Sequence, residues 1–313
     1  NQVSGDHGSA APIAGNKPAP AFALDVAALG GMYARKITLI GTETGLGVRN
    51  AGNVGAGAGG LVVTAQGRLE NTGTFEGARV QLTSGADIDN RGGTVRQTSM
   101  AGLTIDSPVL SNRNGGVIGA EPFAPAAGEG GASSALAGAT GAITAAGTIR
   151  NDGGRIYAGG PITLKTPQID NTGGTLSVAT MAVTGARFSN AGGTLDVSRS
   201  FNANVGQFDN TGGKLNAGSL QISTSGDLIN VGGTLTSAGD ASLAAGGRAD
   251  NTRGIITAVG RLTANVAKAV GNSAATLVAN EGLSLDAGAL RNSGAIRAGN
   301  DIRLAVAGAL VND

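Results

Sequence analysis

The chain has 313 residues, of which 56 are glycine and none is cysteine or tryptophan, and 22 basic against 21 acidic side chains leave a net charge of +1. The balanced charge gives no electrostatic footprint for nucleic acid or for an anionic membrane surface. The lack of cysteine excludes disulfides and thiolate metal sites, and the chain has no run of 18 apolar residues that could span a bilayer.

Residues 1–21 show no hydrophobic periodicity, and we expect an irregular N-terminal tail. This tail holds His7, the single histidine of the chain, so neither a catalytic triad nor a histidine metal site is expected. The apolar stretch Phe22–Ile40 is expected to cover the open N-terminal end of the core and to include a short helix that begins at Asp25.

From residue 22 to residue 313 an asparagine returns about every 20 residues, usually with glycine two or three residues later. Successive asparagines are 19–22 residues apart, apart from one gap of 39 residues. A fixed period of this kind indicates a repeat architecture, which usually makes length or surface and only rarely a single reaction centre. The repeated residues are Asn50, Asn71, Asn90, Asn112, Asn151, Asn171, Asn190, Asn210, Asn230, Asn251, Asn272, Asn292 and Asn312.

One repeat, residues 173–190, reads GGTLSVATMAVTGARFSN. Inward apolar positions alternate in three short segments, at Leu176 and Val178, at Met181 and Val183, and at Phe188 ahead of Asn190. A leucine-rich repeat would need a Leu-x-x-Leu-x-Leu spacing and a helix, and the chain has neither pattern. The sequence therefore predicts an all-β fold, a right-handed parallel β-helix of about 13 rungs, where a rung is one turn of about 20 residues.

The repeated asparagine has the same parity as the inward aliphatic residues, so it should point into the coil at a corner. A buried amide must be hydrogen-bonded, and stacked asparagines can bond one another and the turn backbone. We therefore expect a structural asparagine ladder along residues 22–313, with the following glycines permitting a positive φ at the corner. By strand parity, deleting Ser198 alone should turn Phe201 and Ala203 outward unless the adjoining loop absorbs the shift.

The gap of 39 residues holds one rung and an insertion near Glu121–Gly141, EPFAPAAGEGGASSALAGATG. This segment is rich in alanine, glycine and proline, and we expect it to leave the coil as a flexible loop.

Gly55, Gly57 and Gly60 satisfy the G-x-G-x-x-G pattern. No βαβ unit surrounds them and glycine is abundant, so a chance match explains the pattern better than dinucleotide binding.

The residue before each repeated asparagine forms a second column, which in six successive repeats reads Arg150, Asp170, Ser189, Asp209, Ile229 and Asp250. Its aspartates are two rungs apart, roughly 9.6 Å by strand spacing, which is too far for two carboxylates to share a metal ion. The column is typical of a solvated face, and its spacing argues against a polysaccharide-degrading enzyme. We predict no catalytic, cofactor-binding or metal-binding residues.

The outward position after the paired glycines is often threonine, as at Thr94, Thr175, Thr194 and Thr234. A flat threonine array could bind ice or a glycan. Arg155 and Lys214 interrupt this array, and threonine is also common in exposed strands for structural reasons alone.

The stretch Asp25–Gly52, DVAALGGMYARKITLIGTETGLGVRNAG, resembles the filamentous haemagglutinin family of two-partner secreted exoproteins. That family includes large adhesins and the toxin-delivery proteins of contact-dependent growth inhibition, and its haemagglutinin-type repeats are similar to nearly all the rest of the chain. The chain lacks the Asn-Pro motifs of the family's secretion domain and the Val-Glu-Asn-Asn marker that precedes its toxin domains.

The resemblance implies a rigid, non-enzymatic shaft segment without the secretion signal or the toxin. It implies a secreted or cell-surface location on the outer face of a Gram-negative outer membrane, and an outer-membrane transporter of the two-partner type as secretion partner. A host or bacterial cell-surface receptor or glycan is a further possible partner, and a receptor- or glycan-binding module is the alternative function. No nucleic acid, membrane insertion or cofactor is expected, and an adhesin parent and a toxin-delivery parent stay open.

Overall fold

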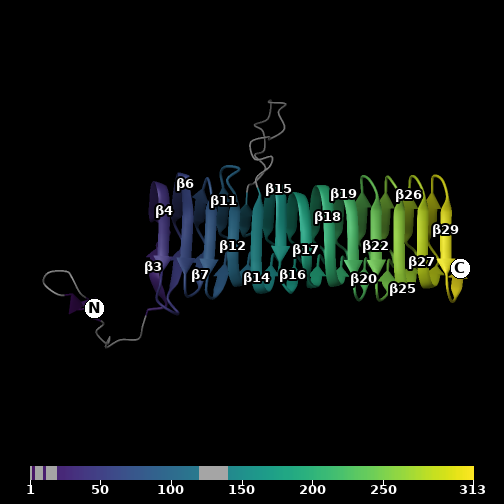
Figure 1. The fold of residues 1–313 in the computed structure, drawn as a ribbon, viewed down its shortest axis with the longest axis horizontal. Coiled ribbons are helices and arrows are strands. Elements are labelled where there is room, and N and C mark those ends of the chain that lie inside the picture. The colour runs from purple at the N-terminus through teal and green to yellow at the C-terminus, as the bar shows by residue number, and fades with distance from the viewer. Residues whose placement is uncertain (1, 4–9, 12–19, 120–139) are drawn as a thin grey trace, which may run out of the picture.

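The computed structural model describes residues 2–3, 10–11, 20–119 and 140–313. These residues form an elongated, all-β solenoid of about 13 turns with about 21 residues per turn (Figure 1). Every strand pairing of the large sheet is parallel, and each strand pairs with its equivalents one turn before and one turn after. The prediction of an all-β parallel β-helix is confirmed. No helix in the described part of the chain has the length and apolar character needed to cross a bilayer.

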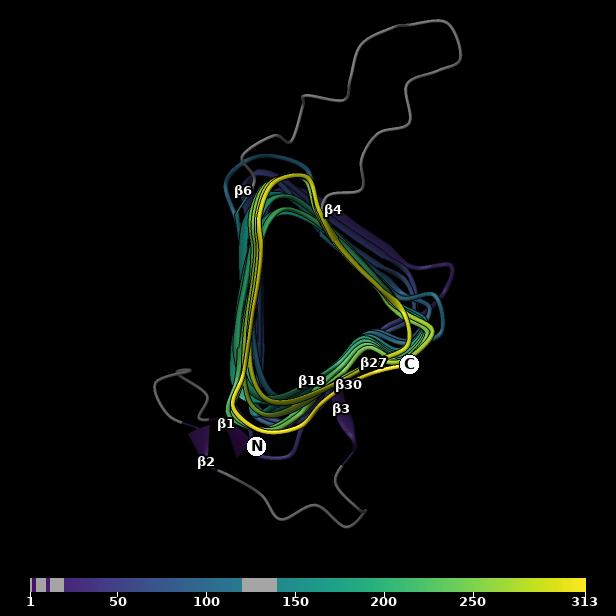
Figure 2. The same ribbon diagram turned by 90° about the vertical axis from the view of Figure 1, so that its right-hand side faces the viewer.

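Seen along its axis, the coil has a triangular outline (Figure 2). Face 1 starts just after the repeated asparagine, face 2 follows, and face 3 leads to the next asparagine. We call the junction of faces 3 and 1 the asparagine corner, that of faces 1 and 2 the second corner, and that of faces 2 and 3 the third corner. Parallel pairing places every residue of a rung against its equivalent, so positions in the repeat become columns along the rod.

Strands confined to face 1 are β8 (Thr74–Gly77), β11 (Thr94–Gln97), β13 (Val117–Gly119), β21 (Thr234–Ser237), β24 (Ile255–Ala258), β26 (Thr276–Ala279) and β28 (Ala295–Ala298). Strands confined to face 2 are β9 (Val80–Ser84), β22 (Ala241–Ala245) and β29 (Ile302–Val306). Strands confined to face 3 are β3 (Phe22–Val26), β5 (Gly47–Asn50), β7 (Leu69–Asn71), β10 (Asp87–Asp89), β16 (Gln168–Asp170), β20 (Leu228–Ile229), β23 (Ala249–Asp250) and β30 (Leu310–Asn312). Longer strands turn one or two corners; they are β4 (Gly31–Gly41), β6 (Asn53–Ala65), β12 (Leu103–Ser111), β14 (Gly141–Arg150), β15 (Arg155–Lys165), β17 (Thr175–Ser189), β18 (Thr194–Asp209), β19 (Lys214–Thr224), β25 (Leu262–Asn272) and β27 (Leu283–Asn292).

The second corner absorbs differences in rung length. One residue separates the paired segments of β17 there, two separate those of β18, and the register shifts lie between Val178 and Thr180 and between Val197 and Ser200. Faces 1 and 2 stay in register on both sides of the corner. A deletion of Ser198 would only convert the β18 corner to the length already present in β17, so the outward turn of Phe201 that strand parity suggests is not expected.

The predicted short helix at Phe22–Ile40 is wrong, because this stretch forms strands β3 and β4. Alternating Phe22, Leu24 and Val26 pair in parallel with β5, and this stacking outweighs any local helical preference. The carboxylate of Asp25 does not cap a helix. It accepts a hydrogen bond from Nε of Arg49 on the next rung, at 3.0 Å.

Within the predicted irregular tail, β1 (Gln2–Val3) and β2 (Ala10–Ala11) form a short antiparallel pair. The other residues of 1–19, including His7, lie outside the described residues. The same is true of 120–139, which hold nearly all of the predicted insertion. Its predicted last residue, Gly141, is the first residue of β14 and pairs with Leu103. The described chain enters and leaves this segment at the second corner.

The core is a narrow column of aliphatic side chains with one aromatic cluster. On face 1, Leu176, Leu195, Leu215 and Leu235 lie directly over one another and are fully buried. Burial of such a side chain contributes roughly 1.5–3 kcal/mol. The rings of Phe188, Phe201 and Phe208 meet in the centre of the coil, with centroid separations of 5.4–6.2 Å.

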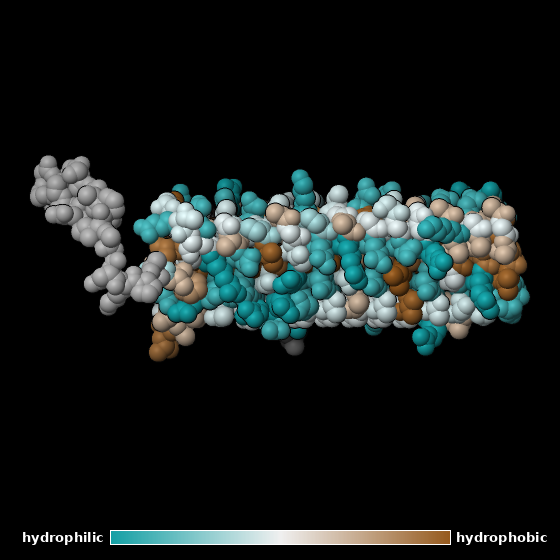
Figure 3. All heavy atoms as spheres, turned by 90° about the horizontal axis from the view of Figure 1, so that it is seen from below, coloured by the Kyte–Doolittle hydropathy of each residue, from teal (hydrophilic) through white to brown (hydrophobic). Residues whose placement is uncertain are grey.

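The outer surface is mainly polar. On the lower side of the rod, polar residues dominate and hydrophobic residues form separate small groups (Figure 3). Exposed large hydrophobic residues include Ile255 and Val259 on one rung, and Ile302, Leu304 and Leu310 on the final rung.

Candidate functional site: the asparagine corner and the outer columns

The repeated asparagines form an unbroken chain of side-chain hydrogen bonds. The Nδ2 atom of each residue from Asn50 to Asn292 donates to Oδ1 of the next, over 2.7–2.9 Å, and the series ends at Asn312. The bond from Asn112 to Asn151 crosses the gap of 39 residues with the same 2.7 Å separation. The asparagines from Asn50 to Asn292 are at most 7 % exposed, and Asn312 on the last rung is exposed.

Both protons of each ladder amide from Asn50 to Asn292 have acceptors. In addition to Asn210 Oδ1 at 2.7 Å, Nδ2 of Asn190 approaches the carbonyl oxygens of Gly193 at 3.3 Å and Lys214 at 3.2 Å. Its Oδ1 accepts from Asn171, and its main-chain N–H donates to the Asp209 carbonyl at 2.6 Å. Each side chain thus joins two rungs and closes its own turn, and its hydrogen-bonding capacity leaves no open site for a ligand.

The two glycines of the corner have different roles. Gly192 has φ of 61° with open space around its Cα, so it supplies a left-handed backbone conformation. A Cβ on Gly193 would lie 2.2 Å from the carbonyl oxygen of Asn171. Arg253 and Ala274 adopt the left-handed conformation without being glycine, which shows that the first position tolerates a side chain at some energetic cost.

The aspartates of the neighbouring column are used inside the turn. The parallel register places Asp170, Asp209 and Asp250 in one column on alternate rungs, with Ser189 and Ile229 between them. Asp209 Oδ1 accepts hydrogen bonds from N and Oγ1 of Thr211, at 3.0 and 2.7 Å, and Asp170 makes the same pair of bonds with Thr172. This arrangement holds the asparagine corner and gathers no pair of carboxylates for acid–base work.

Ion pairs concentrate on the N-terminal rungs. The buried carboxylate of Asp89 accepts from Arg68 at 2.5 Å and from Arg91 at 2.6 Å. Burial acts to raise the pKa of Asp89, but the hydrogen bond from Arg91 and the charges of Arg91 and Arg68 outweigh it and hold the pKa below its ordinary value. Further pairs are Arg49 with Asp25, Arg96 with Glu76 and Arg113 with Asp152. Positive and negative side chains alternate on these rungs, so the surface has no extended region of positive or negative potential.

The outward threonines of face 1 form an interrupted column. Thr74 and Thr94 are in register, as are Thr175 and Thr194. Arg155, Lys214 and Ile255 occupy the same column, so the threonine surface is not continuous. The predicted G-x-G-x-x-G glycines lie along strand β6, where it passes the second corner, and no helix follows them. Within the described ranges, no group of three potential metal-ligating side chains occurs.

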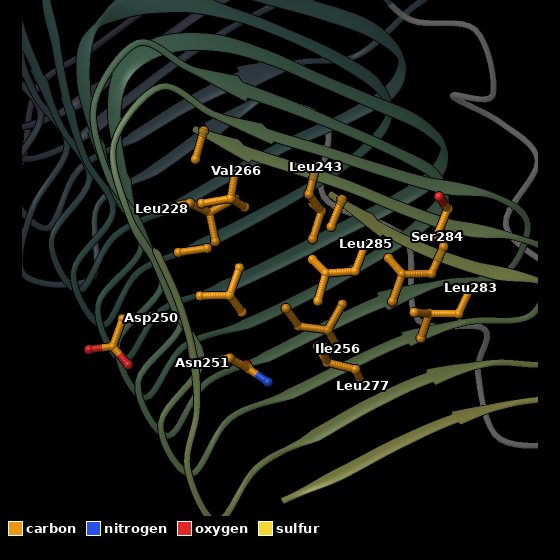
Figure 4. A pocket seen from close by; sticks show the side chains of 15 residues that line it. Leu228, Leu243, Asp250, Asn251, Ile256, Val266, Leu277, Leu283, Ser284 and Leu285 are labelled. Carbon is orange, nitrogen blue, oxygen red and sulfur yellow. The ribbon is translucent and has the colours of Figure 1, made fainter. Parts of the chain in front are cut away.

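An apolar cavity of about 30 Å³ lies in the core of the C-terminal rungs (Figure 4). Leu228, Leu243, Ile256 and Leu277 point toward it, and Ala249 is also among the lining residues. The cavity arises because side chains become smaller along one inward column. The position of Phe208 is taken by Leu228 on the next rung and by Ala249 on the one after. The smaller side chains leave space that the aromatic ring fills upstream. Most of the lining is apolar; Asp250, Asn251 and Ser284 also border the cavity, and Asp250 and Asn251 are already hydrogen-bonded within the asparagine corner and the ladder.

The haemagglutinin repeat model matches residues 179–253 and 236–313. The protein toxin CdiA of Yersinia pestis is 49% identical over 94 residues. Residues 179–313 thus carry haemagglutinin repeats, and these matches support the predicted resemblance to the filamentous haemagglutinin family.

The relatives are far longer than the matched segments. The match to toxin CdiA of Yersinia pestis covers 29% of this chain and 3% of the relative. The tRNA nuclease CdiA-2 of Burkholderia pseudomallei is 52% identical over 69 residues, 22% of this chain and 2% of the relative. A tRNA nuclease CdiA of Escherichia coli O6:K15:H31 is 30% identical over 184 residues, 57% of this chain and 5% of the relative. No solved structure matches the chain.

The haemagglutinin repeats of this chain carry one feature that sequence reasoning missed. Asp227 and Asp240 lie at different corners, yet each accepts a hydrogen bond from a main-chain N–H of the following rung, from Arg248 and Arg261 respectively, both at 2.8 Å. Both follow a glycine in the sequence, and this Gly-Asp pair was the available signal. Here too, charged side chains of the repeat secure rung-to-rung stacking.

Proposed function

We propose that this chain is a rigid shaft segment of a large two-partner secreted exoprotein, which holds binding or toxin domains away from the cell surface. The supporting observation is the unbroken asparagine ladder from Asn50 to Asn312, together with parallel pairing on all three faces. Each rung contacts mainly its two neighbours, so bending the rod would break hydrogen bonds in the sheets and in the ladder together. At roughly 4.8 Å per rung, 13 rungs give a rod of about 60 Å.

The haemagglutinin repeats and the matches to CdiA proteins support a secreted or cell-surface location on a Gram-negative outer membrane, with a two-partner outer-membrane transporter as the secretion partner. The relatives named as toxins and tRNA nucleases favour a growth-inhibition parent over an adhesin. We assign the nuclease activity of such a parent to regions outside this chain, because the matches cover only 2–5% of those relatives and residues 179–313 of this chain are haemagglutinin repeats. The role of this chain is therefore mechanical and non-enzymatic.

Removing one whole rung from the parent protein tests the spacer role. Deleting 211–230 joins Asn210 to Val231, Gly232 and Gly233 and restores the asparagine corner, because β18 and β21 then occupy adjacent rungs. We expect a rod shorter by roughly 4.8 Å in small-angle scattering, with toxin delivery retained. Loss of delivery by a folded deletion protein would identify a required site on that rung and contradict the spacer role.

The matched control removes a single residue within a face. Deleting Asn202 from β18 must turn either Phe201 or Ala203 outward, because strand parity is 2 and no corner lies between them. This variant should unfold at a lower urea concentration than the whole-rung deletion. Equal destabilisation by the two deletions would argue against independent rungs.

A further inference from the structure

The first glycine of the asparagine corner is replaced on two successive rungs. Upstream, this position has φ of 61–65° and is glycine at Gly153, Gly173, Gly192, Gly212 and Gly232. The same position holds Arg253 and Ala274 on the next two rungs, with φ of 55° and 49°. The left-handed conformation brings Cβ close to the following carbonyl oxygen, so each of these two corners stores strain that a glycine corner avoids.

The corner at Asn272 also lacks a hydrogen bond that closes the turn on the preceding rung. There, the N–H of Gly254 donates to the Asn251 carbonyl at 2.8 Å. After Asn272, Ala275 takes the place of this second glycine. Among the described residues, its N–H makes no corresponding bond to the Asn272 carbonyl, which accepts from the N–H of Ser293 on the next rung at 3.3 Å. This turn therefore depends on its neighbours for its geometry.

The core beneath these two corners contains the cavity of about 30 Å³ (Figure 4). Ile256 borders it from the rung of Asn251, and Leu277 borders it from the rung of Asn272. Side chains that line a void lose dispersion contacts on that side. In the aromatic stretch, which we define as β17 and β18, three phenylalanine rings fill the centre of the coil instead. The strained corners thus lie over the less well packed part of the core.

Outer side chains add little to the stacking of these rungs. Arg261 and Glu281 form an ion pair between them, but the charged atoms are 3.6 Å apart and the side chains are 75% and 55% exposed. An exposed pair of this kind contributes little to stability. On the rung that follows, the inward positions Ile302, Leu304 and Leu310 are 40–52% exposed, so burial there is incomplete. Strain, a void, a weak ion pair and incomplete burial therefore coincide in the last rungs of the chain.

We propose that residues 251–313 form an opening unit, which unfolds and refolds while the aromatic stretch stays folded. In a solenoid each rung is held mainly by its two neighbours, so a rung that leaves the stack releases the rungs beyond it. Opening at the two strained corners therefore releases β24, β26 and β28 in one step. A load along the rod would lengthen it first at this unit. The opening unit is a property of the chain itself, so it would remain if the shaft role were disproved.

Hydrogen exchange of the full 313-residue chain, measured by mass spectrometry in native buffer, tests the proposal. We expect β24 and β26 to share one protection factor that is lower than that of β18, with the change falling between β21 and β24. Arg253→Gly and Ala274→Gly relieve the strain and should each slow exchange in β24 and β26 about fivefold or more. The matched control Ser273→Gly adds a glycine at a position whose φ is not positive, and it should not slow exchange.

A reciprocal variant places the same strain in the aromatic stretch. Gly192 has φ of 61° with open space around it, so Gly192→Ala adds strain without a clash, and the fold should persist as it does with Ala274. This variant should speed exchange in β18 and leave β24 and β26 unchanged, because the opening unit opens without unfolding β18. Equal acceleration in β24 and β26 would show that the rod opens as a whole. A protection factor that falls evenly toward the last rung, or no slowing by Arg253→Gly and Ala274→Gly, would also overturn the proposal.

Discussion

Two stretches of the rod share one backbone plan but differ in their cores. Around β17 and β18, Phe188, Phe201 and Phe208 fill the centre of the coil. From Leu228 to Leu285 the corresponding columns carry leucine, valine and alanine, and a cavity of about 30 Å³ remains. The ladder bonds are nevertheless 2.7–2.8 Å in the aromatic stretch and 2.7–2.9 Å in the cavity-bearing stretch. Rung spacing is thus set by the hydrogen-bonded backbone and ladder, while the core adjusts to the residues available.

The aromatic stretch should respond most strongly to truncation. Phe208→Ala removes a fully buried ring that contacts two others, and we expect a loss of about 3–5 kcal/mol in the free energy of unfolding. Leu228→Ala, at the next position of the same column, borders the existing cavity and should cost less. Urea denaturation of both variants measures the difference, and an equal loss would mean that the two cores are equally well packed.

The ladder should be equally important in both stretches. Asn190→Leu and Asn251→Leu each leave neighbouring amides without partners, at an expected cost of about 1–3 kcal/mol. Asn312→Leu, on the exposed last rung, is the control and should cost under about 0.5 kcal/mol. An unchanged urea midpoint for Asn190→Leu would refute a stabilising ladder.

Adding methyl groups should have opposite effects in the two stretches. Ala249→Val extends into the cavity and should stabilise the fold by about 0.5–2 kcal/mol. Ala203→Val adds the same atoms beside Phe201, where a buried alanine leaves no comparable space, and should destabilise by about 1–3 kcal/mol. Thermal melts of the two variants test this, and destabilisation by both would show that the cavity cannot accept a side chain.

Lowering the pH should reduce the stability contributed by ion pairs on the N-terminal rungs and leave the stability difference between the two cores unchanged. The folded-state pKa of Asp89 lies below its unfolded value of 3.8, so its ion pairs stabilise the protein above that pH and are lost as pH falls through the folded pKa. The stability difference between wild type and Asp89→Asn should therefore be full near pH 6 and shrink below pH 3.8. Urea melts from pH 2 to pH 7 measure it, with Phe208→Ala as a control whose cost should not follow this profile. A constant difference for Asp89→Asn would exclude the ion-pair explanation.

The period of the asparagines was sufficient to predict the solenoid, its strands and its approximate number of rungs, because stacking in register converts a repeat in sequence into columns in space. The prediction of a helix at Asp25 was wrong because it considered local signals and left out pairing between rungs. Its local signals were compatible with a helix, and pairing of Phe22–Val26 with the next rung overrode them. The sequence also did not show that a deletion of Ser198 can be tolerated. Only the paired strands show that the second corner accepts either one or two residues.

The sequence by itself determined which residues point inward, where the corners lie and that the chain is built of repeats, since each follows from parity and period along the chain. The tertiary structure alone decided where the core leaves a cavity and which carboxylates close turns or join arginines. The cavity and the ion pairs between rungs depend on side chains that are about 20 or more residues apart in sequence and meet only because neighbouring rungs stack roughly 4.8 Å apart.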